Sequence, residues 1–551
     1  MNAHDTQIFK YLEGSKCFIV PLFQRTYSWG TKHWETLWSD LKGTLEDNSA
    51  THFFGSFVTL PIPSSASEIS KYVIIDGQQR LVTISILLAA LRKRIEEIDS
   101  TSDLKNAIYE QYLTNKFAEE KQDKNKILPT EADRAIFSQI VNSSDTSSSP
   151  EHSIVKAYTF FLEKLSDLKR FDDLRELKNT LLNRFSVVDI CLDKDDDPYL
   201  IFESLNATGE PLTQADLVRN YLFMKISQDN QQEVYDKIWF PMQQKLNLNL
   251  EDFFRHYLAR GGTIPNFNKI YASLKDRAEK TMKTEKEIVE FMKSLATFSE
   301  YYYRFLMPPS EPNGILRTYF EKFNSLEVTT SYPLLLNLYD DYANSRLSLE
   351  DFANLLKTIE TYIVRRAVCG IPTNVLNRFF PTVYQKLTKE DLVGSFKKVL
   401  KEEKGSSRFP EDDDFERDLK QRDLYGTKMA SYLLEAIEKY DNKETVDFQG
   451  LQIEHVMPQT LSDEWKKELG EKTWELIFKK YLHTLGNLTL TGYNPEYSNK
   501  TFLEKRDMEK GFRQSGLRLN RDLAALDIWG EKEISERAER LCKLALVIWS
   551  F

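Results

Sequence analysis

Cysteine is rare in this sequence, and no two cysteines stand close together. The 551 residues contain four, Cys17, Cys191, Cys369 and Cys542, with no Cys-x-x-Cys pair. This excludes a cysteine-bound structural zinc and gives no disulfide framework, as expected in a reducing compartment. Long apolar runs are also lacking, because the longest, at 81–91, is far shorter than the ~20 residues of a membrane span. With no basic-then-apolar segment at its start, the sequence predicts a soluble cytoplasmic protein without a membrane partner.

An excess of positive charge is missing as well. The 74 Lys and Arg residues are outnumbered by 84 Asp and Glu residues, which gives a formal net charge of −10. The protein as a whole is therefore no polycation that coats nucleic acid, and any DNA site must be local. Because 41 % of the residues are hydrophobic, the chain falls among folded proteins, and its length predicts several domains.

Strand-like and helix-like patterns alternate near the start of the chain. Apolar runs with β-branched residues predict strands at 17–23, 53–60, 72–76 and 184–192. An aromatic segment at 29–45 and the apolar run that follows Gly77 predict helices. We therefore expect a mixed α/β N-terminal region.

The rest of the sequence is mainly helical in pattern, so we expect a mostly helical, multidomain α+β protein. The predicted domains are 1–225, with a helical insertion at about 100–183, a helical middle domain at 226–405 and a C-terminal domain at 406–551. The polar segment 142–150 predicts a loop and 401–414 a linker. Thr213 and Asp216 have the spacing of a helix capping box.

The strongest local signal is a pair of motifs near the C-terminus. LQIEHVMPQT at 451–460 is followed about thirty residues later by LGNLTLTGYNPEYSNKTFLEK. Hydrolysis of a phosphodiester with one metal ion requires a base that activates water and oxygen ligands for a divalent cation. Glu454, His455 and the asparagines of the second motif supply such groups.

These motifs resemble those of the HNH, or His-Me finger, nucleases. The resemblance implies a ββα-metal finger embedded in helices, with His455 as the general base, Glu454 as a ligand of Mg²⁺ or Mn²⁺, and Asn487 as the residue that orients the loop of the base. Asn494 is then the third, metal-side residue, with Asn499 as the alternative. The basic residues that follow are candidate DNA-phosphate contacts, although a solvated helix face would explain them too; they are Lys500, Lys505 and Arg506.

A second motif, DGQQR at 76–80, lies where a predicted strand meets a predicted helix. Such a junction presents free backbone amides and the positive end of a helix to an anion. Gly77 permits close approach of the backbone, and Arg80 can bind phosphate through two hydrogen bonds. Asp76 can hold a cation or position a water molecule; alternatively it only caps the helix. The junction is therefore a candidate phosphate site.

The segments IVPLFQRTYSW, FFGSFV and FESLNATGEPLTQADLVRN surround this motif in that order. Together they resemble the N-terminal domain of the GmrS/GmrD and SspE type of modification-dependent restriction proteins, to whose C-terminal partner domain the nuclease motifs correspond. The resemblance implies a ParB/sulfiredoxin-like core with NTPase activity, GTP being the favoured nucleotide. The implied nucleotide-site residues are Gln24, Arg25, Asp76, Gly77, Gln78, Gln79, Arg80, Asn206, Gly209, Arg219 and Asn220.

The sequence therefore predicts a prokaryotic anti-phage endonuclease. We expect it to nick or cleave modified, double-stranded phage DNA, to be regulated by nucleotide binding and hydrolysis, and to need two chains or two events to cut both strands. Two alternatives stay open: a nucleotide-gated DNA-binding protein with a non-catalytic finger, and an RNA-cleaving effector.

Two further groups of residues carry no predicted chemistry. The aromatic cluster of Tyr27, Trp29, Trp34 and Trp38 is expected to pack in the core. The histidines without metal-ligand spacing are His33, His52, His256 and His483.

Overall fold

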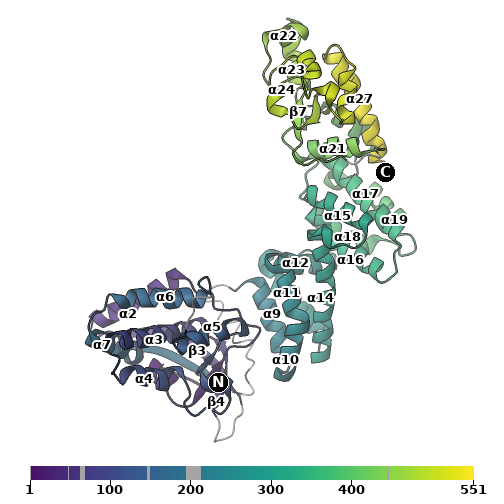
Figure 1. Cartoon of the computed structure of the whole chain (residues 1–551). Coiled ribbons are helices and arrows are strands. Elements are labelled where there is room, and N and C mark those ends of the chain that lie inside the picture. The colour runs from purple at the N-terminus through teal and green to yellow at the C-terminus, as the bar shows by residue number, and fades with distance from the viewer. Residues whose placement is uncertain are drawn as a thin grey trace. The chain divides into compact units, whose positions relative to one another are not determined.

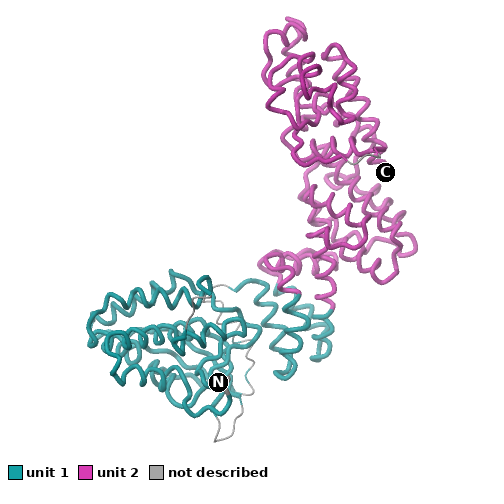
Figure 2. Tube along the Cα trace, viewed as in Figure 1, with its two compact units in different colours: residues 1–241, 271–293 teal, residues 242–270, 294–551 magenta. Residues whose placement is uncertain are grey.

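The structure is a computed structural model, which describes residues 2–47, 49–62, 69–144, 149–193, 196, 201, 212–442 and 446–551. The chain forms two compact units, residues 1–241 with 271–293 and residues 242–270 with 294–551 (Figure 2). Most of the described residues are helical, and the first unit contains a mixed sheet, so the prediction of a multidomain α+β protein is confirmed. The three predicted domain boundaries stay predictions.

The first unit is built around a six-stranded mixed sheet with the order β1-β6-β3-β4-β2-β5. Figure 1 shows β3 and β4 of this sheet among the helices of the unit. Strands β3 and β4 are antiparallel neighbours at its centre, and β2 pairs with the other edge of β4 in parallel. The strands are β1 (Asn2–Gln7), β2 (Lys16–Ile19), β3 (His52–Ile62), β4 (Ser70–Asp76), β5 (Ile127–Leu128) and β6 (Phe185–Cys191).

Helices cover one face of this sheet. Helix α3 is buried almost all round, as expected for a helix that is apolar on every side, and α6 and α7 pack beside it. The helices of the unit's first part are α1 (Ile8–Leu12), α2 (Thr31–Glu46), α3 (Gln78–Ile98), α4 (Leu104–Ile108), α5 (Glu131–Val141), α6 (Ser153–Ser166), α7 (Phe171–Arg184), α9 (Gln214–Met224) and α10 (Gln228–Val234). All four strands and both helices predicted near the N-terminus are confirmed.

The predicted aromatic cluster packs in this core. Tyr27, Trp34 and Trp38 are buried, and Trp29 packs against them from the edge. On the opposite face of the sheet, Leu217 and Met224 of α9 pack on a smaller apolar group. The predicted cap of α9 is confirmed, because Thr213 Oγ1 accepts a hydrogen bond from the backbone of Asp216 at 3.1 Å.

Two strands were not predicted. β1 is polar and mostly exposed and lies at the edge of the sheet, where it pairs antiparallel with β6. β5 has two residues and pairs with β2 inside a segment of helical pattern. Neither has an alternating apolar pattern, and both depend on pairing with a distant strand.

The second unit is mainly helical, and α11, α13 and α14 each have residues in both units. No helix in the described ranges is long and apolar enough to cross a membrane. The helices after α10 are α11 (Phe240–Leu246), α12 (Leu250–Ala259), α13 (Ile270–Thr281), α14 (Glu285–Leu306), α15 (Gly314–Ser325), α16 (Tyr332–Ala343), α17 (Leu349–Val368), α18 (Leu376–Lys386), α19 (Leu392–Glu402), α20 (Asp412–Gln421) and α21 (Lys428–Lys439).

The last part of this unit combines two short strands with helices around two apolar clusters. The segment 401–414, expected to be a linker, instead packs on the helices, since the buried guanidinium of Arg365 donates to Pro410 O at 3.1 Å. The elements are β7 (Gln452–His455), α22 (Asp463–Glu468), α23 (Trp474–Tyr481), β8 (Leu488–Thr491), α24 (Asn494–Tyr497), α25 (Phe502–Asp507), α26 (Arg518–Ala524) and α27 (Glu531–Ile548).

Candidate functional site

The predicted nuclease motif lies on the antiparallel strands β7 and β8. β7 ends with Glu454 and His455, and β8 follows directly after Asn487, so the three residues meet at one end of the strand pair. A cavity of about 360 Å³ opens beside them. Its lining residues are Gln452, Ile453, Glu454, His455, Pro458, Gln459, Asn494, Pro495, Ser498 and Asn499.

His455 is a buried, neutral imidazole. Burial is the main reason why its pKa falls to about 4, and the neighbouring His483 and Lys505 lower it further. Its Nε2 atom lies 3.0 Å from Nδ1 of His483. The ring of Tyr425 stacks on His483, with centroids 5.2 Å apart, and meets His455 edge to face at 4.3 Å. At neutral pH the ring of His455 can therefore accept a proton.

His483 contacts the predicted base, although the sequence analysis assigned this histidine no chemistry. The two histidines are 28 positions apart and come from different elements, so no local spacing signals the pair. When one histidine forms a hydrogen bond with a ring nitrogen of a second histidine, this bond selects the tautomer of the second ring. His483 is thus placed to position the ring of His455, and sequence reasoning did not identify it.

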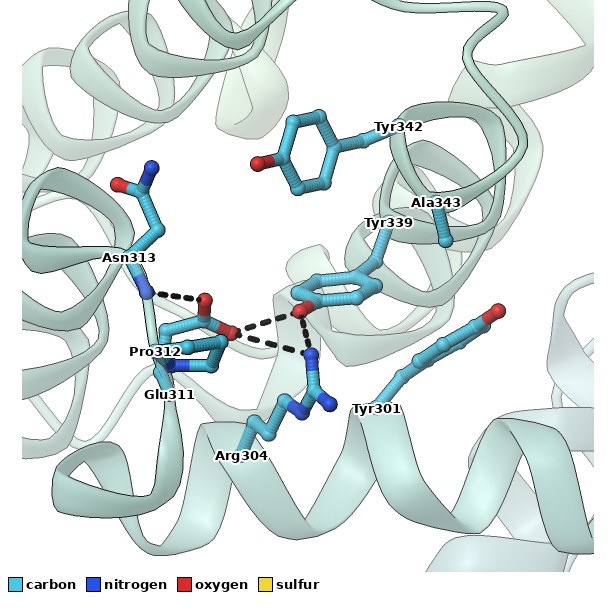
Figure 3. A pocket seen from close by; sticks show the side chains of 8 residues that line it. All are labelled: Tyr301, Arg304, Glu311, Pro312, Asn313, Tyr339, Tyr342 and Ala343. Carbon is cyan, nitrogen blue, oxygen red and sulfur yellow. Dashed lines mark hydrogen bonds and ion pairs between the residues drawn. The ribbon is translucent and has the colours of Figure 1, made fainter.

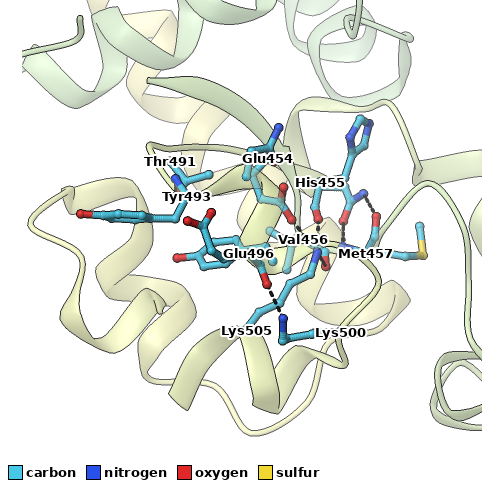
Figure 4. A network of polar contacts seen from close by, with 12 residues as sticks. Glu454, His455, Val456, Met457, Thr491, Tyr493, Glu496, Lys500 and Lys505 are labelled. Carbon is cyan, nitrogen blue, oxygen red and sulfur yellow. Dashed lines mark hydrogen bonds and ion pairs between the residues drawn. The ribbon is translucent and has the colours of Figure 1, made fainter. Parts of the chain in front are cut away.

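Glu454 forms a buried ion pair with Lys505 of α25 (Figure 4). The lysine Nζ lies 2.5 Å from Glu454 Oε1 and also donates to the carbonyl oxygens of His455, at 2.8 Å, and Val456, at 3.3 Å. Burial raises the pKa of Glu454, and the charge of Lys505 offsets part of this rise. Burial lowers the pKa of Lys505, and the charge of Glu454 offsets part of this fall. In the described contacts the second carboxylate oxygen has no partner, so it can bind a cation at the cavity.

Asn487 is fully buried and fastens the loop that follows β7. Its Oδ1 accepts hydrogen bonds from Met457 N at 2.8 Å and Trp529 Nε1 at 3.1 Å. Its Nδ2 donates to Met457 O at 3.0 Å and Leu482 O at 2.9 Å. All four bonds of the amide are satisfied within the protein, which agrees with the predicted role of orienting the loop of the base.

Asn494 and Asn499 both line the cavity, but only Asn494 is anchored to β7. Its Nδ2 donates to Ile453 O at 3.3 Å and to Gln452 Oε1 at 3.4 Å. This leaves Oδ1 of Asn494 without a partner in the contacts that the structure describes, whereas Asn499 is exposed. The geometry favours Asn494 as the third residue of the motif.

Of the three predicted phosphate contacts, only Lys500 is exposed. Lys505 is completely buried on Glu454, and the guanidinium of Arg506 is held by Asp507 and Asp527, each at 2.7 Å. Lys505 and Arg506 are thus buried and already paired with carboxylates, so their predicted contact with phosphate would require these ion pairs to open. Lys500 stays a predicted phosphate contact.

Helix α27 supports the segment before β8. The guanidinium of Arg537 is buried and donates to Gly486 O at 2.8 Å and Leu488 O at 2.7 Å, on either side of Asn487. Burial lowers the pKa of Arg537 to about 9. A Cβ atom on Gly486 would collide with Ile534 O, so glycine is needed for this close approach.

The predicted nucleotide motif lies at the junction of β4 and α3, in the first unit. Asp76 ends the strand, and its carboxylate pairs with Arg80 Nη2 at 3.0 Å. Gly77 has a φ of +94°, and a Cβ atom there would collide with the ring of Phe57. Arg80 also lies over that ring, 5.7 Å from its centroid. Gly77 is thus required by the backbone, and Arg80 is held by Asp76.

The three glutamines predicted at this site bind the backbone instead of projecting freely. Gln24 Nε2 donates to Ile74 O at 2.9 Å, and Gln78 Nε2 donates to Arg25 O at 3.3 Å. Gln79 accepts from Ser28 N at 2.8 Å. Together they hold the segment 23–28 against the end of β4 and the start of α3.

The remaining residues predicted for the nucleotide site differ in their burial and contacts. Arg219 is buried, pairs with Asp216 at 2.6 Å and donates to Phe23 O, so α9 is tied to the same segment. Asn220 is buried next to it, and its Oδ1 has no hydrogen-bond partner in the described part of the chain. Arg25 is half-buried. The predicted residues Asn206 and Gly209 lie outside the described residues.

Comparison with known proteins agrees with this arrangement. A model of the N-terminal domain of the GmrSD restriction endonuclease matches residues 7–223, and a model of the C-terminal domain of GmrSD restriction endonucleases matches residues 409–544. No curated protein matches the chain. The first match contains the β4–α3 junction and the second contains the β7–β8 site, in the order that the sequence predicts. The chain therefore belongs to the GmrSD restriction endonuclease family and is a defence nuclease that acts on modified DNA.

Proposed function

We propose that the C-terminal site is an HNH nuclease centre that hydrolyses DNA with Mg²⁺, and that a nucleoside triphosphate bound in the N-terminal domain controls it. The observation that supports this best is the meeting of His455, Glu454 and Asn494 at one cavity, with Asn487 fixing the loop between them.

His455 acts as the general base. Its Nε2 faces His483, so the tautomer with the proton on Nε2 donates to His483 and leaves the lone pair of Nδ1 for a water molecule. Because burial keeps the pKa of His455 near 4, the ring is neutral at physiological pH and its lone pair is available to the water molecule. His483 and Asn487 hold the ring and its loop in place.

The residues at the cavity fit a magnesium ion. Mg²⁺ prefers oxygen ligands and binds through one or two carboxylates together with waters and phosphate oxygens. Glu454 offers its second carboxylate oxygen, and Asn494 offers Oδ1. When bound, the ion would stabilise negative charge on the phosphate and the leaving oxygen. Glu454 is oriented for this role by Lys505, whose ammonium group holds the other carboxylate oxygen.

A plasmid-nicking assay with Mg²⁺ tests the nuclease proposal. His455→Ala should lose cleavage while DNA binding is kept, and His4→Ala, which changes an exposed histidine in β1, should cleave like the wild type. Unchanged cleavage by His455→Ala would instead support a regulatory protein with a non-catalytic finger. Cleavage of RNA but not of DNA by the wild type would support the RNA-cutting alternative.

The nucleotide proposal rests on the β4–α3 junction. The start of α3, with Arg80 beside it and Gly77 at its cap, is suited to bind a phosphate group. A phosphate there would compete with Asp76 for Arg80. Arg80→Ala should weaken binding of a fluorescent GTP analogue, and Arg94→Ala, which removes an arginine from the far end of the same helix, serves as the control. Equal binding of the analogue by the wild type, Arg80→Ala and Arg94→Ala would contradict this site. Separate cleavage assays with and without GTP test whether the nucleotide controls the nuclease.

A further inference from the structure

A pocket that none of the predicted chemistry uses lies between the end of α21, helix α26 and the second half of α27. We call it the α27 pocket. It has a volume of about 410 Å³, which lies within the range of sites for small ligands. Four aliphatic residues line it, and the first three of them are buried: Ile437, Leu519, Leu541 and Leu544. An apolar group of a ligand can therefore leave water here.

Two of the four basic residues at this pocket are uncompensated. Arg540 pairs with Asp522 at 2.7 Å, and Arg518 donates to a backbone carbonyl oxygen at 2.9 Å. Arg521 and Lys543 are exposed, and within the described ranges of the chain neither forms a hydrogen bond or an ion pair. The pocket thus offers two cations to the negatively charged end of a ligand.

The three acidic residues at the pocket do not offset these cations. Glu438 is buried, and its two oxygens accept hydrogen bonds from the backbone nitrogens of Arg518 and Leu519, each at 2.8 Å. Asp522 is paired, so Asp441 is the one lining carboxylate without a partner among the described residues. Asp441 would repel a ligand with several negative charges, whereas a single charge can stay close to the two cations. The pocket therefore favours a monoanion.

A fifth cation, Arg537, is buried without a carboxylate partner among the described residues. Its Nε and Nη2 atoms have no hydrogen-bond partner in that part of the chain either. Burial and the charge of Arg540 lower the pKa of Arg537, and Asp522 offsets part of this fall. Because Arg540 and Asp522 both line the pocket, an anion bound there also lies within electrostatic reach of Arg537. Such an anion would reduce the cost of burying this charge.

The helices that line the pocket also hold β8 and the segment before it. Asn520 of α26 donates through Nδ2 to Leu490 O at 3.0 Å and accepts from Thr489 Oγ1 at 2.5 Å. On α27, Arg537 donates to the carbonyl oxygens on either side of Asn487. A ligand that joins α26 to α27 would therefore stiffen the segment 486–490.

A larger cavity in the same unit provides a contrast. It has a volume of about 500 Å³ and lies between the end of α14, the connection to α15 and the end of α16 (Figure 3). Its arginine, Arg304, lies 3.7 Å from the buried carboxylate of Glu311, which also accepts a hydrogen bond from Tyr339 at 2.7 Å. The rings of Tyr301 and Tyr339 pack against each other at 4.6 Å. The charge and the aromatic faces of this cavity are satisfied within the protein, unlike the cations of the α27 pocket.

We propose that the α27 pocket binds a small organic anion with one carboxylate head and an apolar body, and that this ligand fastens the segment around Asn487. The head would meet Arg521 and Lys543, and the body would cover the aliphatic lining. None of the residues predicted for the nuclease or the nucleotide site lines this pocket. Binding is independent of the proposed nuclease chemistry, whereas any effect on cleavage rests on it.

The test measures binding to the full-length protein by calorimetry, without a metal ion and at low salt, so that cleavage does not enter and the exposed cations are little screened. The probes are octanoate and 2-naphthoate, with octanol and 2-naphthol as their uncharged counterparts. At least one carboxylate should bind about tenfold more tightly than its counterpart. Octanoate reports an aliphatic body and naphthoate an aromatic one.

Variants at the rim locate the site. Arg521→Ala and Lys543→Ala should each weaken binding of the carboxylate about threefold, and the double variant about tenfold. Leu544→Ala, which shortens the half-buried part of the lining, should weaken it about threefold. Lys532→Ala removes an exposed lysine from the first turn of α27, outside the pocket, and should bind like the wild type.

The proposal is overturned if neither carboxylate binds the wild type, or if the folded double variant binds it as tightly as the wild type does. Octanol that binds as tightly as octanoate would also overturn it. Amide exchange tests the second half of the proposal, because the bound carboxylate should slow exchange in the segment 486–490. Unchanged exchange with binding retained would refute the link to Asn487. A failure of the nuclease proposal alters none of these readouts, since none of them requires cleavage.

Discussion

Replacing Lys505 with methionine tests the buried ion pair at the proposed nuclease site. The change keeps the length of the side chain but leaves the carboxylate of Glu454, only 5 % exposed, without its cation. Removing one partner of a buried pair costs about 3–5 kcal/mol, because the remaining charge is unpaired. An exposed lysine should behave differently, so Lys500→Met is expected to change stability by less than about 0.5 kcal/mol.

The cost should depend on pH with a defined sign. Burial already raises the pKa of Glu454 above its ordinary value, and without Lys505 it rises further. The folded variant then binds a proton more tightly than the unfolded chain, so its stability falls as the pH rises from about 4.5 toward neutrality. The destabilisation should therefore be large at pH 8 and small near pH 4. In Glu454→Gln/Lys505→Met the pH dependence should disappear.

Amide exchange of β7 and β8 in urea reports this local stability. Adding Mg²⁺ should restore part of it in Lys505→Met, by about 1.4 kcal/mol at ten times the dissociation constant, since the ion then neutralises Glu454. Glu454→Gln should remove the rescue. A cost below about 1 kcal/mol at pH 8, or the same cost at pH 4 and pH 8, would refute the argument that Lys505 compensates a buried carboxylate.

Three further changes test other parts of the structure. Asn487→Leu leaves the backbone groups of Met457, the carbonyl of Leu482 and the indole of Trp529 unpaired, so unfolding in urea should show a loss of about 3–5 kcal/mol; a loss below 1 kcal/mol would mean that water replaces the amide. The rate of nicking should stay constant from pH 8 down to about 5, because His455 has a pKa of about 4; a rate that falls with an apparent pKa near 6.5 would contradict a buried, neutral base. Gly77→Ala should destabilise the first unit by about 2–4 kcal/mol in a thermal melt, since the left-handed backbone and the ring of Phe57 both oppose a Cβ atom, whereas Gly14→Ala, with open space at the Cβ position, should cost about 1 kcal/mol.

Motifs at the ends of strands could be predicted because local signals mark them. The apolar run that ends at Asp76 and the glycine after it define a strand and the start of a helix without reference to distant residues. The same holds for Glu454 and His455, which end a short strand, and for Asn487, which precedes one. Residue type and position in these elements were enough to place the candidate site.

Long-range partners could not be predicted in this way. Lys505 has the surroundings of an exposed lysine, since a capping box and another basic residue flank it, and only its contact with β7 shows that it is buried. His483 lies in a turn with no metal-ligand spacing, and its role follows from the ring of His455 beside it. Strand β1 is polar along its length and exists through its pairing with β6. In each case the deciding interaction joins segments that are far apart in the sequence.

The support that Arg537 gives to both sides of Asn487 has a consequence during protein synthesis. The ribosome completes β7, β8 and the loop between them well before it adds α27. At about 5–20 residues per second, roughly 3–10 s separate the synthesis of Asn487 from that of Arg537. During this interval the carbonyl groups beside Asn487 lack their arginine donor, and the nascent chain holds the motif residues without the helix that fixes them. The segment around Asn487 therefore cannot reach its final geometry until α27 has been translated.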